Sequence, residues 1–205
     1  VAGLQDNKAY EYARWADSRT PCAQLTYDDL AIPSSVPQEP ESAFRKPFVN
    51  PLATMFTVAT GFNFVDPACK GIEFVCWPTV GVSGVEYYES KGAGIPGWDH
   101  VLLVPTLKRG SLYVLPLSPD GKTAAGRFSR YFQSENRFRD TAVSPDGRTI
   151  YIATDPGGVA GAKDAGTTSK MENPGAVLAF TYAGEGMPGA SQQPPLVSEV
   201  RRPEE

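Results

Sequence analysis

From residue 50 onward, short apolar runs alternate with groups of turn residues along the chain. The runs are rich in Val, Leu, Phe and Tyr, and each has the length of a single β-strand. We predict strands at 52–59, 84–88, 101–107, 111–117, 128–132, 138–143, 149–154 and 176–182. Residues 1–50 lack this pattern, and within them one short helix is predicted at about 6–17.

A repeated turn divides the predicted strands into pairs. The sequence Ser-Pro-Asp-Gly occurs at 118–121 and again at 144–147, each time between two apolar runs. Pro fixes the backbone at the second turn position, and Gly accepts a positive φ at the fourth. Residues 84–132 therefore read as one unit of about four antiparallel strands, and 138–182 as most of another. Such units are typical of β-propeller blades, and a β-sandwich is the alternative.

The composition is that of an ordinary globular protein. The 205 residues include 41% hydrophobic and 20% charged residues, with 20 Gly and 19 Pro, which favours turns over long helices. The net charge of −4 gives no reason to expect a nucleic-acid partner, and no apolar run predicts a membrane span. Residues 184–205 are rich in Pro, Gly, Gln and Glu, so we expect a flexible tail. The N-terminus lacks Met and a charged leader, which is the expected result of maturation or chain cleavage.

Three cysteines and one histidine restrict the chemistry. Cys69 and Cys76 enclose a short loop, and either a disulfide or two buried thiols would fit this spacing. Cys22 is then left over, free or paired with another chain. A Ser-His-Asp triad would have to use His100, whose place at the start of an apolar run favours a structural role. No Cys/His set has zinc spacing, and no glycine-rich loop has the nucleotide-binding form.

Several charged and aromatic residues stand at the ends of predicted strands. In an extended chain Arg137 and Arg139 lie on one face, where two guanidiniums suit a polyanion; the alternative is a solvated strand edge. Lys108 ends an apolar run and is directed at a sheet rim, unless it lies in an exposed hairpin turn. Trp77 next to Pro78 forms either a rigid wall for a sugar or part of the core.

Asp155 leaves the predicted strand at 149–154 just before Pro156, Gly157 and Gly158. A carboxylate in this position can bind a metal, order an arginine or cap a turn. Capping is the usual role of Asp in such turns.

Together these segments resemble the soluble pyrroloquinoline-quinone-dependent glucose dehydrogenases and the wider glucose/sorbosone dehydrogenase family. The resemblance is nearly continuous from 51 to 182, looser before this range, and absent from the tail. It is carried by Asp-Pro-Ala-Cys at 66–69, Val-Cys-Trp-Pro-Thr at 75–79, Gly-Trp at 97–98, the run from Leu102 to Gly110, Asn-Arg-Phe-Arg-Asp at 136–140, Ser-Pro-Asp-Gly at 144–147 and Glu-Asn-Pro-Gly at 172–175.

The resemblance implies an all-β fold that forms the C-terminal blades of a six-bladed β-propeller. Residues 1–183 would belong to this one domain, with a loop-rich segment that contains a calcium site at 1–50 and the blades at 51–183. The family's cofactor residues correspond here to Lys108, Arg137 and Arg139, with Thr79 and Asp155 beside them. Cations suit a quinone that carries three carboxylates, and they favour its electron-rich reduced form.

The resemblance also implies residues for the sugar, a metal and a disulfide. Trp77 corresponds to an aromatic residue at the sugar site, and Phe74 stands where the family has a tyrosine, so the family's sugar preference does not carry over to this chain. A structural calcium ion would be bound by oxygen atoms of Ala2, Leu4 and Asp6, with a further carboxylate from Glu39. A family disulfide corresponds to Cys69 and Cys76.

The family's general base, a histidine, lies upstream of every matching motif, so no catalytic residue is expected in this chain. The resemblance implies that the enzyme oxidises aldose sugars at C1 to lactones and passes electrons to an external acceptor. We expect an N-terminal part of the propeller as partner, on a separate cleaved chain or otherwise, and without it an inactive chain. A homodimer and a secreted or periplasmic location also fit the family. The alternative is a propeller that binds ligands without catalysis.

Overall fold

The computed structural model describes residues 8–10, 38–40, 51–56, 67, 72–90, 93–162 and 166–184. The chain divides into two units, Val1–Pro51 and Leu52–Glu205. In the first unit β1 (Lys8–Tyr10) pairs with β2 (Gln38–Pro40) in antiparallel register. The helix predicted at 6–17 is therefore wrong over Lys8–Tyr10, because pairing with a distant strand outweighs a weak local preference. The rest of that prediction lies outside the described residues.

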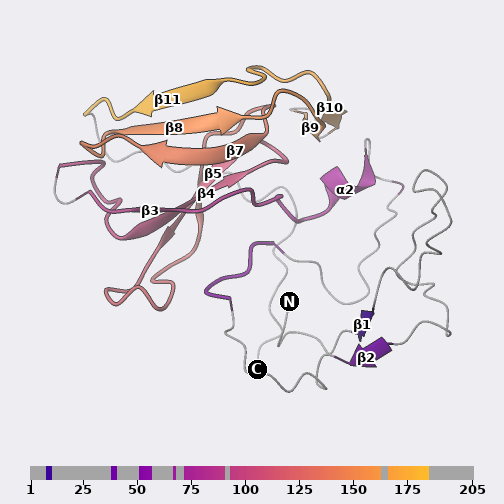
Figure 1. Cartoon of the computed structure of the whole chain (residues 1–205), viewed down its shortest axis with the longest axis horizontal. Helices are drawn as coiled ribbons and strands as arrows, with labels where there is room; N and C mark the ends of the chain where they lie inside the picture. Colours follow the sequence, from indigo (N-terminus) through magenta and orange to yellow (C-terminus); the bar gives the residue numbers. More distant parts are fainter. Residues whose placement is uncertain are drawn as a thin grey trace. The chain divides into compact units, whose positions relative to one another are not determined.

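The second unit contains a four-stranded antiparallel sheet in sequential order (Figure 1). Its strands are β3 (Glu86–Tyr88), β4 (Val101–Thr106), β5 (Ser111–Pro116) and β6 (Ser129–Tyr131). This is the four-stranded unit predicted for 84–132, and the central pair β4–β5 is in register over all six residues of each strand. The predicted all-β class is confirmed for the described residues, where the sheets are accompanied only by the short helix α2 (Glu73–Cys76).

A second sheet of three described strands lies beside the first (Figure 1). Its order is β11 (Val177–Thr181), β8 (Thr149–Thr154) and β7 (Phe138–Val143), all antiparallel. Between β8 and β11 the chain forms a small ribbon of β9 (Ala160–Gly161) and β10 (Thr167–Thr168). The pairing of β7 with β8 is irregular at its start, where Phe138 faces Thr154 but Asp140 already faces Ala153. Arg139 is thus the extra residue of a β-bulge, and such bulges redirect side chains.

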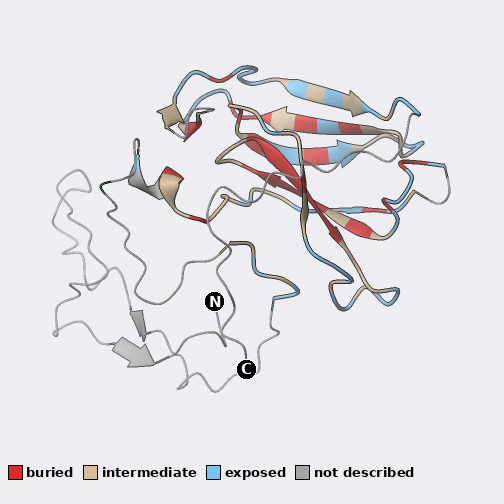
Figure 2. Ribbon diagram, turned by 180° about the vertical axis from the view of Figure 1, so that it is seen from behind, coloured by how far each residue is buried: buried red, intermediate tan, exposed pale blue. Residues whose placement is uncertain are grey.

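The core lies between the two sheets (Figure 2). Leu103 of β4 and Leu112 of β5 are fully buried, as is Ile152 of β8. Trp98 packs edge-on against Tyr131 with ring centroids 4.7 Å apart, and Phe132 stacks on Phe180 at 3.9 Å. The core side chains of β4, β5 and β8 come from every second position, which are 101 and 103, 112 and 114, and 150 and 152.

The two Ser-Pro-Asp-Gly turns have the same geometry, as their identical sequence predicts. In each turn the Gly N–H donates to the Ser carbonyl at 2.8 Å. The φ values of Gly121 and Gly147 are 69° and 71°, a region that favours glycine. The Asp carboxylate also accepts hydrogen bonds from its own Ser hydroxyl and from the backbone two residues later. These bonds lower the pKa of Asp120 and of Asp146, because they favour the charged form.

Two predictions at the start of the second unit need correction. The strand predicted at 52–59 is wrong over its described residues 52–56, which lie in no strand. Phe56 has a φ of 50°, which a strand excludes, and its ring packs 5.4 Å from that of Tyr113. The sequence also gave no sign of α2, whose last residue Cys76 takes part in a disulfide bond. Among the described residues, no helix has the length and apolar character needed to span a membrane.

Candidate cofactor site

Lys108 lies in the turn at 107–110, between β4 and β5. Its backbone N–H donates to the carbonyl of Val80 at 3.1 Å, which holds the turn against the segment that follows α2. Its ammonium group donates to the hydroxyl of Thr79 at 2.8 Å and to the carbonyl of Trp77 at 3.3 Å. The same nitrogen lies 5.9 Å from the Trp77 ring centroid. Thr79, Trp77 and Lys108, all predicted site residues, therefore meet in one place.

Burial changes the ionisation of Lys108. Desolvation, with a smaller contribution from the neighbouring Arg109 guanidinium, lowers the pKa of Lys108 to about 8. Burial also lowers the pKa of Arg109, and the charge of Arg130 adds to this effect. The charges of Lys108 and Arg109 at this turn are therefore partly desolvated, and a bound anion would offset the free-energy cost of that desolvation.

Arg137 and Arg139 share one carboxylate, that of Asp155. Arg137 Nε donates to Asp155 Oδ2 at 3.0 Å, while Arg139 Nε and Nη2 donate to Oδ1 and Oδ2 at 2.6 and 2.7 Å. The Asp155 side chain is 10% exposed, that of Arg137 20% and that of Arg139 52%. The bonds from Arg139 and Arg137 hold the pKa of Asp155 below its usual value, against the opposing effect of burial. Asp155 orders both arginines, one of the three roles its position suggested.

The segment from Asp155 to Gly161 connects the two groups of cations. Arg137 Nη1 donates to the carbonyl of Val159 at 2.7 Å, and the backbone N–H of Gly161 donates to the carbonyl of Lys108 at 2.5 Å. The backbone N–H of Asp155 itself donates to the Arg137 carbonyl at 3.0 Å. One segment of chain therefore contacts Arg137 at one end and the Lys108 turn at the other.

Residues 67–161 match the sequence model of a family described as glucose/sorbosone dehydrogenase. Over 184 residues the chain is 38% identical to quinoprotein glucose dehydrogenase B of Acinetobacter calcoaceticus. This similarity covers 89% of the chain. Both comparisons relate the chain to the glucose/sorbosone dehydrogenase family. The chain spans 38% of the length of that relative.

The matched range contains both groups of cations and the segment that joins them. It begins before α2 and ends at Gly161, so Thr79, Lys108, Arg137, Arg139 and Asp155 all lie inside it. The resemblance stated from the motifs is thereby confirmed at the level of the family.

Two hydrogen-bonded asparagines, Asn136 and Asn173, lie next to the segment that contains Asp155. Asn136 is 1% exposed; its Oδ1 accepts from the backbone N–H of Asn173 at 2.7 Å, and its Nδ2 donates to the Asn173 side chain at 3.2 Å. The Thr154 hydroxyl accepts from the backbone N–H of Ala176 and donates to the Asn173 carbonyl. Both asparagines belong to the sequence motifs, but only the structure shows that they bond to each other. Together with the Thr154 hydrogen bonds, this contact holds the chain next to Asp155 in place.

Other predicted residues of the family site lie outside this geometry. Phe74 is in α2, but its side chain is not among those described. Glu39 lies in β2 opposite Ala9, with its side chain likewise undescribed. Among the described residues, no group of three or more His, Cys, Asp or Glu is placed to bind a metal. The remaining predicted or unassigned residues, Ala2, Leu4, Asp6, Cys22 and Cys69, fall outside the described part of the chain, so the Cys69–Cys76 pairing stays a prediction.

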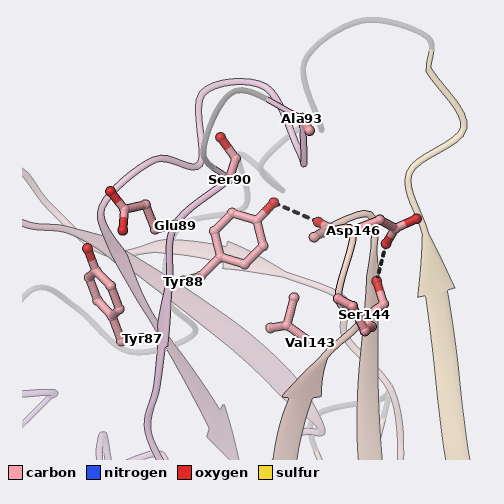
Figure 3. Close-up of a pocket in the computed structure, with 10 residues that line it drawn as sticks. Tyr87, Tyr88, Glu89, Ser90, Ala93, Val143, Ser144 and Asp146 are labelled. Atoms are coloured by element: carbon pink, nitrogen blue, oxygen red, sulfur yellow. Dashed lines mark hydrogen bonds between the residues drawn. The ribbon is translucent and has the colours of Figure 1, made fainter.

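A cavity of about 290 Å³ lies elsewhere in the second unit, between the end of β3 and the turn at 144–147 (Figure 3). The hydroxyl of Tyr88 donates to the Gly147 carbonyl at 2.7 Å and accepts from the N–H of Ile95 at 2.7 Å. None of the three predicted cofactor cations lines this cavity. Nearby, the hydroxyl of Tyr87 is hydrogen-bonded to His100 Nδ1 at 2.6 Å.

Proposed function

We propose that this chain supplies the cationic face that binds pyrroloquinoline quinone in an aldose dehydrogenase. The observation that carries the proposal is the placing of Lys108, Arg137 and Arg139 around one segment, Asp155–Gly161, in a chain related to the glucose/sorbosone dehydrogenase family. The name of the relative, a quinoprotein glucose dehydrogenase, supports a quinone cofactor and a sugar substrate.

The donor groups fit such a ligand. A quinone with three carboxylates needs cations that still have N–H groups to offer. Arg139 is half exposed, and within the described part of the chain its remaining N–H groups make no hydrogen bond. The Lys108 ammonium bonds only neutral oxygens, those of Thr79 and Trp77, so an anion would be its first opposite charge among the described residues. Guanidinium groups match carboxylates in two-point geometry.

Each residue has a separate role in the proposed site. When bound, the quinone would supply the acceptor for the two electrons that leave C1 of the sugar, which becomes a lactone. Arg137 and Arg139 would bind its carboxylates, and Lys108 would place a positive charge beside the bound quinone. The hydroxyl of Thr79, which orients the Lys108 ammonium, would also contact the quinone. Trp77 would offer its ring to the C–H face of the sugar.

The proposal also requires the remainder of the fold. The chain spans 38% of the relative's length, and the four-stranded sheet is of the kind that β-propellers repeat as blades. We propose a six-bladed propeller completed by an N-terminal part, in the same polypeptide or a second one. That part would provide the general base, and the complete protein would bind calcium. A secreted or periplasmic location and an external electron acceptor belong to the same proposal.

The test is titration with pyrroloquinoline quinone of the protein as isolated, together with any polypeptide that copurifies. A hydrogen bond to a charged group contributes about 1.5–3 kcal/mol, so Lys108→Ala and Arg137→Ala should each weaken quinone binding about 10- to 100-fold. Lys122→Ala is the matched control, because Lys122 is exposed and only its backbone supports a turn. Unchanged quinone affinity in both site variants would overturn the proposal.

A second measurement separates an enzyme from a binding protein. With quinone and calcium added, the proposed dehydrogenase reduces a redox dye only when an aldose is present. Quinone binding without any sugar-dependent dye reduction would instead favour a propeller that has lost catalysis.

A further inference from the structure

Gly158 lies against the guanidinium of Arg137. A Cβ atom built on Gly158 would be 2.8 Å from Arg137 Nε, closer than real Cβ contacts allow, and 3.0 Å from its Cδ. The φ of Gly158 is 120°, a conformation that other residues rarely adopt. The close approach is thus open only to glycine.

The hydrogen bonds of Arg137 explain why its side chain lies so close to this backbone. Its Nε donates to Asp155 at 3.0 Å and its Nη1 to the Val159 carbonyl at 2.7 Å, so Arg137 is bound on both sides of Gly158. To reach both acceptors at once, the guanidinium must pass over the turn between them. A side chain at 158 would stand in this path.

Gly157 differs from Gly158 in both respects. A Cβ on Gly157 would meet nothing within 4 Å, and its φ is not positive. The two neighbouring glycines therefore form a natural comparison, in which only the second contacts Arg137.

We propose that Gly158 is a positioning residue for Arg137, and that through Arg137 it sets the affinity for the quinone. This inference rests on the proposed function above. In a Gly158→Ala variant the flexible end of Arg137 would move in preference to the backbone, and Arg137 would lose the bond to Val159 and its alignment with Asp155. The cation would remain in the protein but no longer in the geometry that receives a carboxylate.

The experiment is a double-mutant cycle on quinone affinity, measured by titration with pyrroloquinoline quinone on the isolated protein with any copurifying chain. We expect Gly158→Ala to weaken binding about tenfold, the loss of one charged hydrogen bond. Gly157→Ala should stay within about twofold of the parent, as expected for a change that meets no neighbour. In an Arg137→Ala background, Gly158→Ala should change the affinity less than about twofold, because residues that act through one another are not additive.

The outcomes separate the two proposals. If Lys108→Ala and Arg137→Ala both leave quinone affinity unchanged, the proposed function fails; if only Arg137→Ala does so, the positioning role of Gly158 fails. If Arg137→Ala weakens binding but Gly158→Ala matches Gly157→Ala, or its effect adds fully to that of Arg137→Ala, only the positioning role fails.

The same variants also test whether a loss of affinity reflects a failure to fold. If Gly158→Ala does not fold, the double variant with Arg137→Ala should restore folding, because the conflicting side chain is gone. A double variant that is also unfolded would assign the defect to backbone strain and overturn the role.

Discussion

Replacing Asp155 by Asn removes a charge on which two arginines depend, while it keeps the size of the side chain. The carboxylate accepts one hydrogen bond from Arg137 and two from Arg139, and its side chain is 10% exposed. An amide offers one acceptor oxygen instead of two, and its own N–H groups would face those of the arginines. We expect the variant to unfold at a lower temperature than the parent.

The size of the effect follows from the exposure of each partner. The Arg137 side chain is 20% exposed, so its bond falls in the range of about 1.5–3 kcal/mol for charged hydrogen bonds. The Arg139 side chain is 52% exposed, and solvent screening limits its contribution to about 1 kcal/mol at most. The free energy of unfolding should fall by about 1.5–4 kcal/mol in total, which lowers the melting temperature of a protein of this size by about 3–16 °C.

The pH dependence provides the sharper assay. The two arginines hold the pKa of Asp155 below its usual value, so its stabilisation is complete above the unfolded pKa of about 4. It is lost as the pH falls through the lower pKa of the folded state. Thermal melts followed by circular dichroism should therefore show the full deficit of Asp155→Asn at pH 7 and a smaller one at about pH 3.

The control for charge loss is Asp140→Asn on the neighbouring strand. Asp140 is exposed, and its Oδ1 accepts from the N–H of Thr141, a bond that an amide oxygen can also accept. Its stability should change by less than about 0.5 kcal/mol. An Asp155→Asn deficit that is equal at both pH values, or absent at pH 7, would refute the reasoning.

Two further predictions concern the turn and the core. Because burial lowers the pKa of Lys108 to about 8, quinone affinity should be constant below this pH and weaken about tenfold per pH unit above it, as titrations from about pH 6 to 9.5 would measure. Lys108→Arg should abolish this dependence, and a flat profile in the parent would contradict it. Leu103→Ala in the fully buried centre of β4 should cost about 2–5 kcal/mol in chemical denaturation. Val85→Ala at a 62% exposed position should cost less than about 0.5 kcal/mol, and equal losses in the two variants would refute the assignment of the core.

Most of the strands could be predicted from apolar residues beside strong turn signals. The runs that became β4, β5, β7 and β8 are each bounded by glycine, proline or a Ser-Pro-Asp-Gly turn, and the structure places a strand in every one. The run at 52–59 had boundaries of the same kind, Pro51 and Gly61, yet its described residues form no strand. Its apolar character did indicate contact with other aromatic residues, as the packing of Phe56 on Tyr113 shows, but burial does not require an extended backbone. The helix α2 is a single turn, too short for a helical period to be visible in the sequence.

The charged residues of the site could be named from sequence, but their connections could not. Spacing alone left Arg137 and Arg139 on a solvated edge, and only the combined motifs favoured a binding site. The carbonyl of Val159 and the missing side chain of Gly158 carry no chemical signature, because any residue has a carbonyl and many turns contain glycine. The bulge at Arg139 was equally hidden, since a shift in strand register leaves no trace in a single sequence.

The Asp155 carboxylate has two opposite effects on anion binding, because it lowers the positive charge of the site and it also orders the two arginines. Removing the charge of Asp155 would make the site more positive, and Coulomb attraction alone would then strengthen binding of an anion. Against this, Asp155 and Val159 together fix Arg137 before any ligand arrives, so little side-chain entropy remains to be lost on binding. Within the described part of the chain, Arg139 still has N–H groups that make no hydrogen bond, and its half-exposed side chain leaves the added attraction screened by solvent. The ordering of the arginines by Asp155 therefore contributes more to quinone affinity than the Coulomb attraction that its removal would add. Asp155→Asn should weaken quinone binding even though it raises the net positive charge of the site.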